Sequence, residues 1–302
     1  MGARMAGASI IAGIDYWNIA SASYSKNFTS ARTIATDIRK VHPKRLHELI
    51  GEIELMVASP DCTDHSCAKG SRTRNEKSKL TAFQVVRFAE EFRPKWIVIE
   101  NVVQMKSWDR HQELMEELCK LNYLLKEEKL NSQDFGVPQS RRRLFLICTL
   151  RKPFDFTIRA SENIRPASSI IDFNGSYSFT PLFASKRASA TIERAKRAIS
   201  ILGTREPFLI VYYGSDGGGG WQSLDRPLRT ITTIDRFAFV KPSTTGHIIR
   251  MLQPEELKLG MGFPKNYELK VGTRRDRIKL MGNAVCPPVM KAIIETLIEH
   301  DA

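Results

Sequence analysis

The chain has 302 residues, of which 42% are hydrophobic and 26% charged. This composition supports a folded core and excludes a largely disordered protein. Its longest apolar runs, such as 96–99 and 144–148, are far shorter than the roughly 20 residues that cross a bilayer, so we expect no membrane partner. Lysine and arginine exceed aspartate and glutamate by 46 to 33, a net charge of +13. This surplus suits a polyanionic partner such as nucleic acid, and a well-solubilised surface is the equally weighted alternative.

The cysteines and the N-terminus indicate a reducing compartment. The five cysteines are odd in number and irregularly spaced, which argues against a disulfide framework. The first residues contain no apolar stretch typical of a signal peptide. We therefore expect a cytoplasmic protein.

Apolar runs and helical patterns alternate in the first half of the chain. This alternation predicts an α/β fold with a doubly wound, mostly parallel sheet, whose ligands lie at the carboxyl ends of the strands. In chain order, the expected elements are a strand over 10–14, a helix over 17–28, a strand over 55–58, a helix over 80–92, a strand over 95–100, a helix over 111–121 and a strand over 143–149.

The composition changes near residue 150, where serine, threonine, arginine and glycine become frequent. This region contains a basic helix candidate over 186–201, a glycine run at 217–220 and a β-type segment over 227–234. The glycine run is typical of a flexible loop, and close approach to DNA is the alternative. Two closing helices are expected over 254–259 and 288–299. The predicted domains are 1–150, a smaller irregular domain over 151–245, and a C-terminal segment over 246–302.

One predicted strand runs into a turn that presents Cys62. A thiol on such a turn is a nucleophile if its pKa is lowered, although an isolated loop cysteine is more often inert. His65 and Cys67 lie close by in the sequence, but zinc usually takes four ligands in paired spacings. No second pair follows, so we expect no metal.

Two further segments carry polar groups beside predicted strands. Glu100 follows an apolar strand, where a carboxylate either caps a helix or, near a reactive cysteine, serves as a general acid. Arg141 and Arg143 alternate on a predicted strand and should point to the same face. Two guanidinium groups on one face suit phosphate or base-edge contacts, and a solvated edge strand is the alternative.

Taken in order, these motifs resemble the bacterial and phage DNA (cytosine-5)-methyltransferases. Pro60-Asp-Cys62, Glu100-Asn-Val and Gln139-Ser-Arg-Arg-Arg143 are followed by motifs at 250–264 and 281–285. The resemblance extends from residue 2 to about 292. It implies a Rossmann-like methyltransferase fold, a target-recognition domain over 151–245, and a C-terminal segment that packs back on the catalytic domain. The implied reaction transfers methyl from S-adenosyl-L-methionine to C5 of cytosine in duplex DNA.

The resemblance also assigns catalytic roles. The Cys62 thiolate would add to C6 of a flipped-out cytosine, since a base inside a duplex is out of reach. Glu100 would act at N3, Arg141 near O2, and Arg143 would support that site. Asp61 adjoins the thiol and would raise its pKa, so we expect a nearby arginine or lysine to offset this charge.

Cofactor and DNA contacts follow from the same motifs. Asp15 would bind the ribose hydroxyls and Tyr16 would stack on adenine. The implied cofactor residues are Asp15, Tyr16, Asp37, Ile38, Asn283 and Val285. The implied DNA-binding residues are Lys69, Arg72 and Arg74 in a loop that closes over DNA, together with Gln139, Arg229, Thr230 and Thr232. The implied partners are double-stranded DNA of the nucleoid and a separately acting restriction endonuclease, and we expect a monomer.

The family's first strand and its Phe-x-Gly-x-Gly-Gly loop have no counterpart here, because the first residues match the helix that follows them. We therefore expect reduced stability and weak cofactor binding. A non-catalytic DNA-binding remnant and a tRNA cytosine-5 methyltransferase are the alternatives, and the sizeable variable region favours DNA. Amino-methyltransferases are disfavoured, because no Asp-Pro-Pro-Tyr or Asn-Pro-Pro-Tyr occurs.

Overall fold

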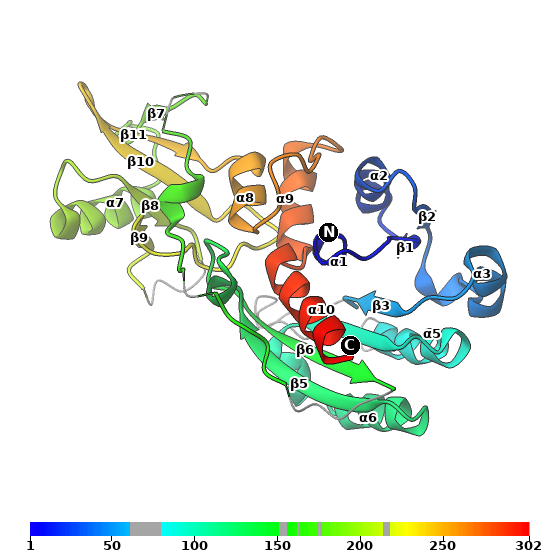
Figure 1. Cartoon of the computed structure of the whole chain (residues 1–302). Helices are drawn as coiled ribbons and strands as arrows, with labels where there is room; N and C mark the ends of the chain where they lie inside the picture. The colour runs from blue at the N-terminus through cyan, green and yellow to red at the C-terminus, as the bar shows by residue number, and fades with distance from the viewer. Residues whose placement is uncertain are drawn as a thin grey trace. The chain divides into compact units, whose positions relative to one another are not determined.

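The computed structural model describes the chain in two compact units (Figure 1). The first unit comprises residues 1–131, 142–160 and 287–302, and the second comprises 132–141 and 161–286. Residues 246–286 therefore belong to the second unit, and only the last helix belongs to the first. The described residues are 1–60, 80–150, 156–161, 163–173, 175, 177–213 and 218–301.

The first unit alternates helices and strands along most of its length. Most of the predicted elements are found within two residues of their expected ends, and the predicted helix over 80–92 divides into a 3-10 turn and α5. In chain order the elements are α1 (Gly2–Met5), β1 (Ala12–Asp15), α2 (Asn18–Asn27), β2 (Arg32–Ala35), η1 (Ile38–Lys40), α3 (Pro43–Ile50), β3 (Leu55–Ala58), η3 (Leu80–Phe83), α5 (Gln84–Phe92), β4 (Trp96–Asn101), η4 (Val103–Ser107), α6 (His111–Lys120), β5 (Leu124–Asn131), β6 (Arg142–Thr149) and α10 (Pro287–Asp301).

The strands of this unit form a four-stranded sheet and a separate pair. The sheet has the order β3-β4-β6-β5, and β1 pairs with β2. The pairs β1–β2 and β3–β4 are parallel, whereas β4–β6 and β5–β6 are antiparallel. The predicted α/β class is confirmed. The parallel pairing does not extend to β5 and β6, because the ten residues between them include no crossover helix, which parallel neighbours require.

The core of the first unit lies where α5 and α6 cover one face of the four-stranded sheet. Val85 and Ala89 from α5 and Leu118 from α6 pack against Ile97 and Ile99 of β4. Every residue of β4 is buried, as expected for a central strand covered on both faces. Burial of each large aliphatic side chain contributes roughly 1.5–3 kcal/mol, so this layer holds β4 firmly in place.

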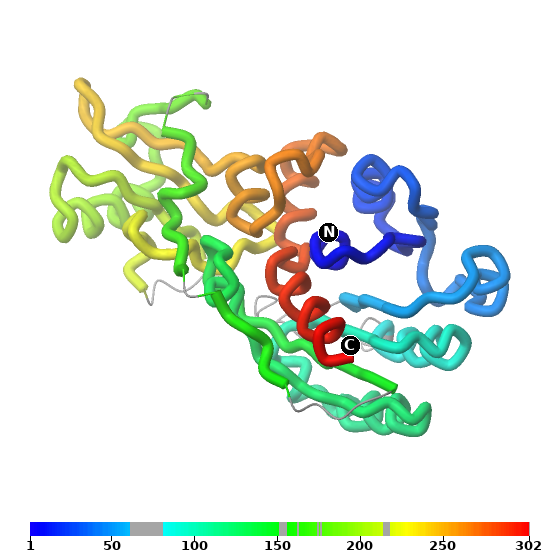
Figure 2. Tube along the Cα trace, viewed as in Figure 1, coloured from blue at the N-terminus to red at the C-terminus, as the bar shows by residue number. Residues whose placement is uncertain are grey.

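Two glycines of the first unit leave no room for a Cβ without a shift of their neighbours. An added Cβ at Gly13 in β1 would lie 2.4 Å from the ring of Tyr24 in α2. An added Cβ at Gly2 in α1 would lie 2.6 Å from Met290 Cβ and from Pro287 O in α10. The first helix therefore lies beside the beginning of the last one, as the blue and red tubes in Figure 2 show.

The second unit is built on an antiparallel sheet. Its strands have the order β7-β11-β10-β8-β9, and Ala195 and Ala198 of α7 pack against Phe208, Ile210 and Val240. The sequence predicted an irregular domain here, but much of the region is regular. The elements are η5 (Ser132–Phe135), η6 (Ala167–Ile170), β7 (Thr180–Pro181), α7 (Ser189–Leu202), β8 (Phe208–Val211), β9 (Trp221–Ser223), β10 (Phe237–Ser243), β11 (Gly246–Met251), α8 (Pro254–Gly260) and α9 (Arg274–Asn283).

The predicted β-type segment over 227–234 is not a strand of this sheet. Its only β-type pairing within the described residues is an isolated bridge between Leu228 and Gln139. The main-chain groups of Leu228 bond to Pro138 and Ser140, and the amide of Ile231 donates to the side chain of Gln139. These partners replace a strand ladder, so the segment follows residues 138–141 instead.

Candidate active site

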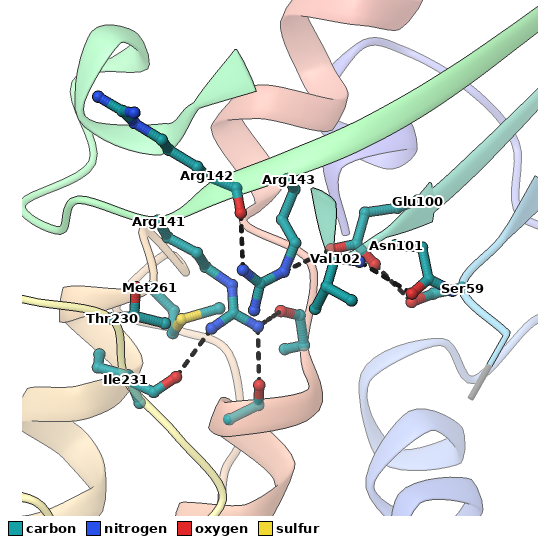
Figure 3. Close-up of polar contacts among 12 residues, drawn as sticks. Ser59, Glu100, Asn101, Val102, Arg141, Arg142, Arg143, Thr230, Ile231 and Met261 are labelled. Atoms are coloured by element: carbon teal, nitrogen blue, oxygen red, sulfur yellow. Dashed lines mark hydrogen bonds and ion pairs between the residues drawn. The ribbon is translucent and has the colours of Figure 1, made fainter. Parts of the chain in front are cut away.

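Glu100 lies at the carboxyl end of β4 with both carboxylate oxygens in polar contacts (Figure 3). The hydroxyl of Ser59 donates to Oε2 at 2.6 Å, and Nε of Arg143 lies 3.2 Å from Oε1. Glu100 is only 4% exposed. A buried carboxylate is tolerated when it is paired and hydrogen-bonded, as it is here.

The strand registers explain why these three side chains meet. The parallel ladder pairs Ala58 with Ile99, so Ser59 leaves β3 beside Glu100. The antiparallel ladder pairs Glu100 with Phe145. Arg143 precedes Phe145 by two residues on the same face, which makes it a diagonal neighbour of Glu100. The site therefore follows from the pairing of β3, β4 and β6.

Asn101 bonds to the chain that follows β3. Its side-chain amide donates to the carbonyl of Pro60 at 3.1 Å, and its Oδ1 accepts the Val102 amide at 2.8 Å. The chain two residues before Cys62 is thereby fastened to the end of β4. Cys62 itself lies outside the described residues.

The two predicted arginines lie in different surroundings. β6 begins at Arg142, so Arg143 lies on the strand and Arg141 lies one residue before it. Arg143 contacts Glu100 and donates to the carbonyl of Arg142 at 2.8 Å, and it is the arginine next to the carboxylate. Arg141 is 4% exposed and belongs to the second unit, where it donates to main-chain carbonyls.

The predicted cofactor residues of the first unit lie at the carboxyl end of β1 and just after β2. Asp15 ends β1 and is exposed, and its Oδ1 accepts the Trp17 amide at 2.8 Å. Tyr16 follows it with 71% of its surface exposed. A carboxylate beside an open aromatic ring matches the hydroxyls and base of a nucleoside, so these residues fit the adenosyl part of S-adenosylmethionine.

Asp37 and Ile38 begin the turn after β2. The Asp37 side chain accepts from the Arg39 amide and pairs with the Arg39 guanidinium. These hydrogen bonds lower the pKa of Asp37 to about 2, so it is an anion at neutral pH. Ile38 packs against the cluster of Leu46, Phe88 and Phe92.

The predicted C-terminal cofactor residues close the second unit. Asn283 is the last residue of α9 and is exposed. Val285 lies two residues further on and is partly buried. An added Cβ at Gly282 would lie 2.4 Å from main-chain atoms of Thr232 and Thr233. Glycine at this position allows the end of α9 to touch that segment.

The predicted DNA-binding residues of the second unit all make contacts within it. Arg229 donates to the carbonyls of Gly218 at 3.0 Å and Trp221 at 3.2 Å. The hydroxyl of Thr230 donates to Ser140 O at 3.0 Å, and that of Thr232 to Ile234 O at 3.2 Å. Gln139 is fully buried with its amide engaged inside the unit, so the structure does not offer it to DNA. Lys69, Arg72 and Arg74 lie outside the described residues.

Sequence reasoning missed one residue of the site, Ser59. It is the first polar side chain after a predicted strand, and that position was the available signal. Within the part of the chain that the structure describes, no cluster of three metal-ligand side chains occurs, and no helix is long and apolar enough to cross a membrane.

Comparison with known proteins identifies the family. Residues 1–299 match the C-5 cytosine-specific DNA methylase family, so the chain belongs to it. This match confirms the predicted family.

Three relatives differ in how much of their length matches this chain. The type II methyltransferase M.HindV of Haemophilus influenzae is 26% identical over 319 residues, covering 100% of this chain and 93% of that enzyme. M.DdeI of Desulfomicrobium norvegicum is 33% identical over 154 residues, 48% of this chain. The matched part spans only 36% of the length of M.DdeI, and 35% of that of M.AgeI of Thalassovita gelatinovora.

Solved structures of similar fold include methyltransferases from eukaryotes. The Entamoeba histolytica methyltransferase EhMeth has a TM-score of 0.69 at 20% identity, over 97% of this chain and 90% of that one. Spodoptera frugiperda DNMT2 has a TM-score of 0.67 at 15% identity, over 98% and 95%. The likeness supports the methyltransferase fold.

Proposed function

We propose that this chain transfers a methyl group from S-adenosyl-L-methionine to C5 of cytosine in duplex DNA. The observation that carries the proposal is the buried Glu100 carboxylate, held at 2.6 Å by Ser59 and at 3.2 Å by Arg143. It lies on the strand whose next residue, Asn101, donates to the carbonyl of Pro60, two residues before Cys62 in the sequence. Family membership and the net charge of +13 agree with a DNA substrate.

The residues divide the chemistry between a nucleophile and a group that polarises the ring. In the proposal the Cys62 thiolate adds to C6 of a flipped-out cytosine, and the electron pair of the C5–C6 bond becomes available at C5. For this step Glu100 must be protonated, and as a carboxylic acid it donates its proton toward N3, where negative charge develops as the thiolate adds. After C5 is methylated, a base removes its proton, the double bond re-forms and the thiolate leaves.

Arg143 rather than Arg141 is assigned to the ring's O2. Arg143 already holds Glu100, and a guanidinium has five N–H donors, so it can orient the carboxylate and still donate to the base. Both terminal nitrogens of Arg141 donate to main-chain carbonyls of the second unit. This assignment reverses the roles that the sequence motif implied for the two arginines.

Asp15 and Tyr16 are the residues proposed to hold the cofactor, by accepting the ribose hydroxyls and stacking on adenine. S-adenosylmethionine, when bound, supplies the electrophilic methyl group. Asp37, an anion with a pKa of about 2, is proposed to accept from the adenine amino group. The other proposed cofactor-binding residues are Ile38, Asn283 and Val285.

The named relatives suggest a biological setting. M.HindV and M.DdeI are type II methyltransferases, and we propose the same role here, as a monomer acting on cytoplasmic DNA beside a separate endonuclease. Arg229, Thr230 and Thr232, with Lys69, Arg72 and Arg74, are proposed to contact that DNA.

A covalent trap tests the proposal. Duplex DNA carrying 5-fluorocytosine is incubated with the protein and S-adenosylmethionine. Release of the thiolate requires a base to remove a proton from C5. The analogue has fluorine there instead of hydrogen, so the covalent adduct should persist. We expect a denaturation-resistant complex with the wild type and none with Cys62→Ser. Unmodified duplex and tRNA carrying the same analogue are the comparisons. DNA binding without an adduct, or an adduct on tRNA alone, contradicts the proposal.

A further inference from the structure

Residues 132–141 link two strands of the first unit, yet they belong to the second. Their main chain is bonded to a distant segment, since the Leu228 amide donates to Pro138 O at 2.9 Å and the Ser140 amide donates to Leu228 O at 2.7 Å. The hydroxyl of Thr230 adds a bond to Ser140 O at 3.0 Å. The link therefore runs beside residues 228–230.

Arg141 extends this contact to two more places in the second unit (Figure 3). Its Nη1 donates to Ile231 O at 2.8 Å, and its Nη2 donates to Gly282 O at 2.7 Å and to Ala284 O at 3.3 Å. All three acceptors are main-chain carbonyls, so the buried guanidinium determines the course of the backbone. Charge-assisted hydrogen bonds of this kind are stronger than neutral ones.

Gln139 also bonds to Ile231. Its Oε1 accepts the Ile231 amide at 2.7 Å, and its Nε2 donates to Gly260 O at 3.1 Å. Both peptide groups of Ile231 are therefore bonded, the amide to Gln139 and the carbonyl to Arg141. The hydroxyl of Tyr213 also donates to Thr230 O at 2.5 Å.

The end of α9 is held against this segment. Gly282 lies so close to Thr232 and Thr233 that an added Cβ would overlap their main chain at 2.4 Å. Arg141 donates to the carbonyl of Gly282 and to that of Ile231 at once. One side chain thus connects residues 231 and 282–284.

We propose that Arg141 is a positioning residue that, with Gln139, sets the backbone of 230–232 and of 282–284 for target recognition. It acts through these segments and does not touch the reacting base. The inference rests on the proposed function, in which Thr230 and Thr232 contact DNA. It replaces the catalytic role that the sequence motif implied for Arg141.

The test compares Arg141→Lys with Arg142→Lys. Lysine keeps the charge but lacks the planar fork that reaches the carbonyls of 231 and 282–284. Arg142 is the exposed neighbouring residue and serves as the matched control. Methyl transfer is measured over a range of DNA concentrations, on a well-methylated duplex and on duplexes that differ from it by one base pair.

For Arg141→Lys we expect KM for DNA to rise about tenfold or more, and the preference for the best duplex to shrink. Turnover at saturating DNA should fall less than about threefold, and Arg142→Lys should match the wild type. A hundredfold fall in saturating turnover with unchanged KM and preference would mean that Arg141 acts at the reacting base. A uniform fall in turnover alone would mean a smaller folded fraction. Either result overturns the inference, as does wild-type behaviour.

Amide hydrogen exchange without DNA separates this inference from the proposed function. Arg141→Lys should speed exchange in 228–233 and 282–286 while β10 keeps its protection. If the wild type methylates no DNA, the proposed function fails, and this measurement still decides whether Arg141 braces the two segments. If Arg141→Lys unfolds throughout, Gln139→Met, which removes the acceptor of the Ile231 amide, must show the same local change. Unchanged exchange overturns the inference.

Discussion

The contact between Arg143 and Glu100 makes a sharp prediction about stability. Arg143→Met keeps the length of the side chain but removes the guanidinium that lies 3.2 Å from the carboxylate. Glu100 is 4% exposed and keeps only the hydroxyl of Ser59 among these two contacts. Removing one partner of a buried ion pair costs about 3–5 kcal/mol of folding free energy. Because 16% of the Arg143 side chain remains exposed, we expect about 3 kcal/mol.

A second substitution separates charge from shape. Glu100→Gln removes the buried charge but leaves a carbonyl that accepts from Ser59. The double variant Glu100→Gln/Arg143→Met should recover about 2 kcal/mol of the free energy lost in Arg143→Met. All three variants should lose at least about a hundredfold in methyl transfer, because the polarised ring contact is gone.

Urea unfolding followed by tryptophan fluorescence measures these free energies, and Arg142→Met is the matched control on the same strand. The reasoning is refuted if the double variant is no more stable than Arg143→Met. It is refuted equally if the double variant methylates DNA at the wild-type rate.

Three further predictions concern other parts of the first unit. Ser59→Ala removes the 2.6 Å hydrogen bond to the Glu100 carboxylate and should lower the unfolding free energy by about 1.5–3 kcal/mol. Ser59→Thr keeps the hydroxyl and should retain most of that free energy. Equal stability of the two variants would contradict the site geometry. Tyr16→Ala removes a residue that is 71% exposed, so the free energy of unfolding should change by less than about 0.5 kcal/mol. The Kd for S-adenosylmethionine, measured by calorimetry, should rise about tenfold. An unchanged Kd would show that Tyr16 does not contact the cofactor. Hydrogen bonding to Glu91 raises the pKa of His47, so its stabilising effect is complete below the unfolded value of 6.5 and disappears as pH rises through the higher folded pKa. The difference in stability between the wild type and His47→Gln should therefore be largest near pH 5 and vanish at alkaline pH, and a difference that grows with pH would show the opposite sign.

Short apolar strands were readable from the sequence because burial on both faces leaves a continuous hydrophobic run. β4 is such a run. Its sequence ends in a charged residue, Glu100, which was correctly expected at the carboxyl end of the strand. β5 was not predicted, since its sequence, Leu-Leu-Lys-Glu-Glu-Lys-Leu-Asn, has four consecutive charged residues. An edge strand carries such charges, which discourage pairing with other chains, and they conceal its strand character.

The roles of the arginines could not be read from spacing alone. The strand begins at Arg142, so Arg143 lies on it and Arg141 lies just before it. The acceptors of Arg141 are carbonyls 90 and 141 residues away in the chain, which no local pattern reveals. Side chains that bond to the main chain depend on tertiary structure, so their partners emerge only with the fold.

The most direct measurement of the central claim is transfer of labelled methyl. The chain is incubated with methyl-labelled S-adenosylmethionine and mixed-sequence duplex DNA, and the DNA is digested to identify the labelled base. The account predicts label in 5-methylcytosine, absent with Cys62→Ser and strongly reduced with Glu100→Gln. Label in another base, or equal label with Cys62→Ser, would contradict it, and so would the absence of label with the wild type.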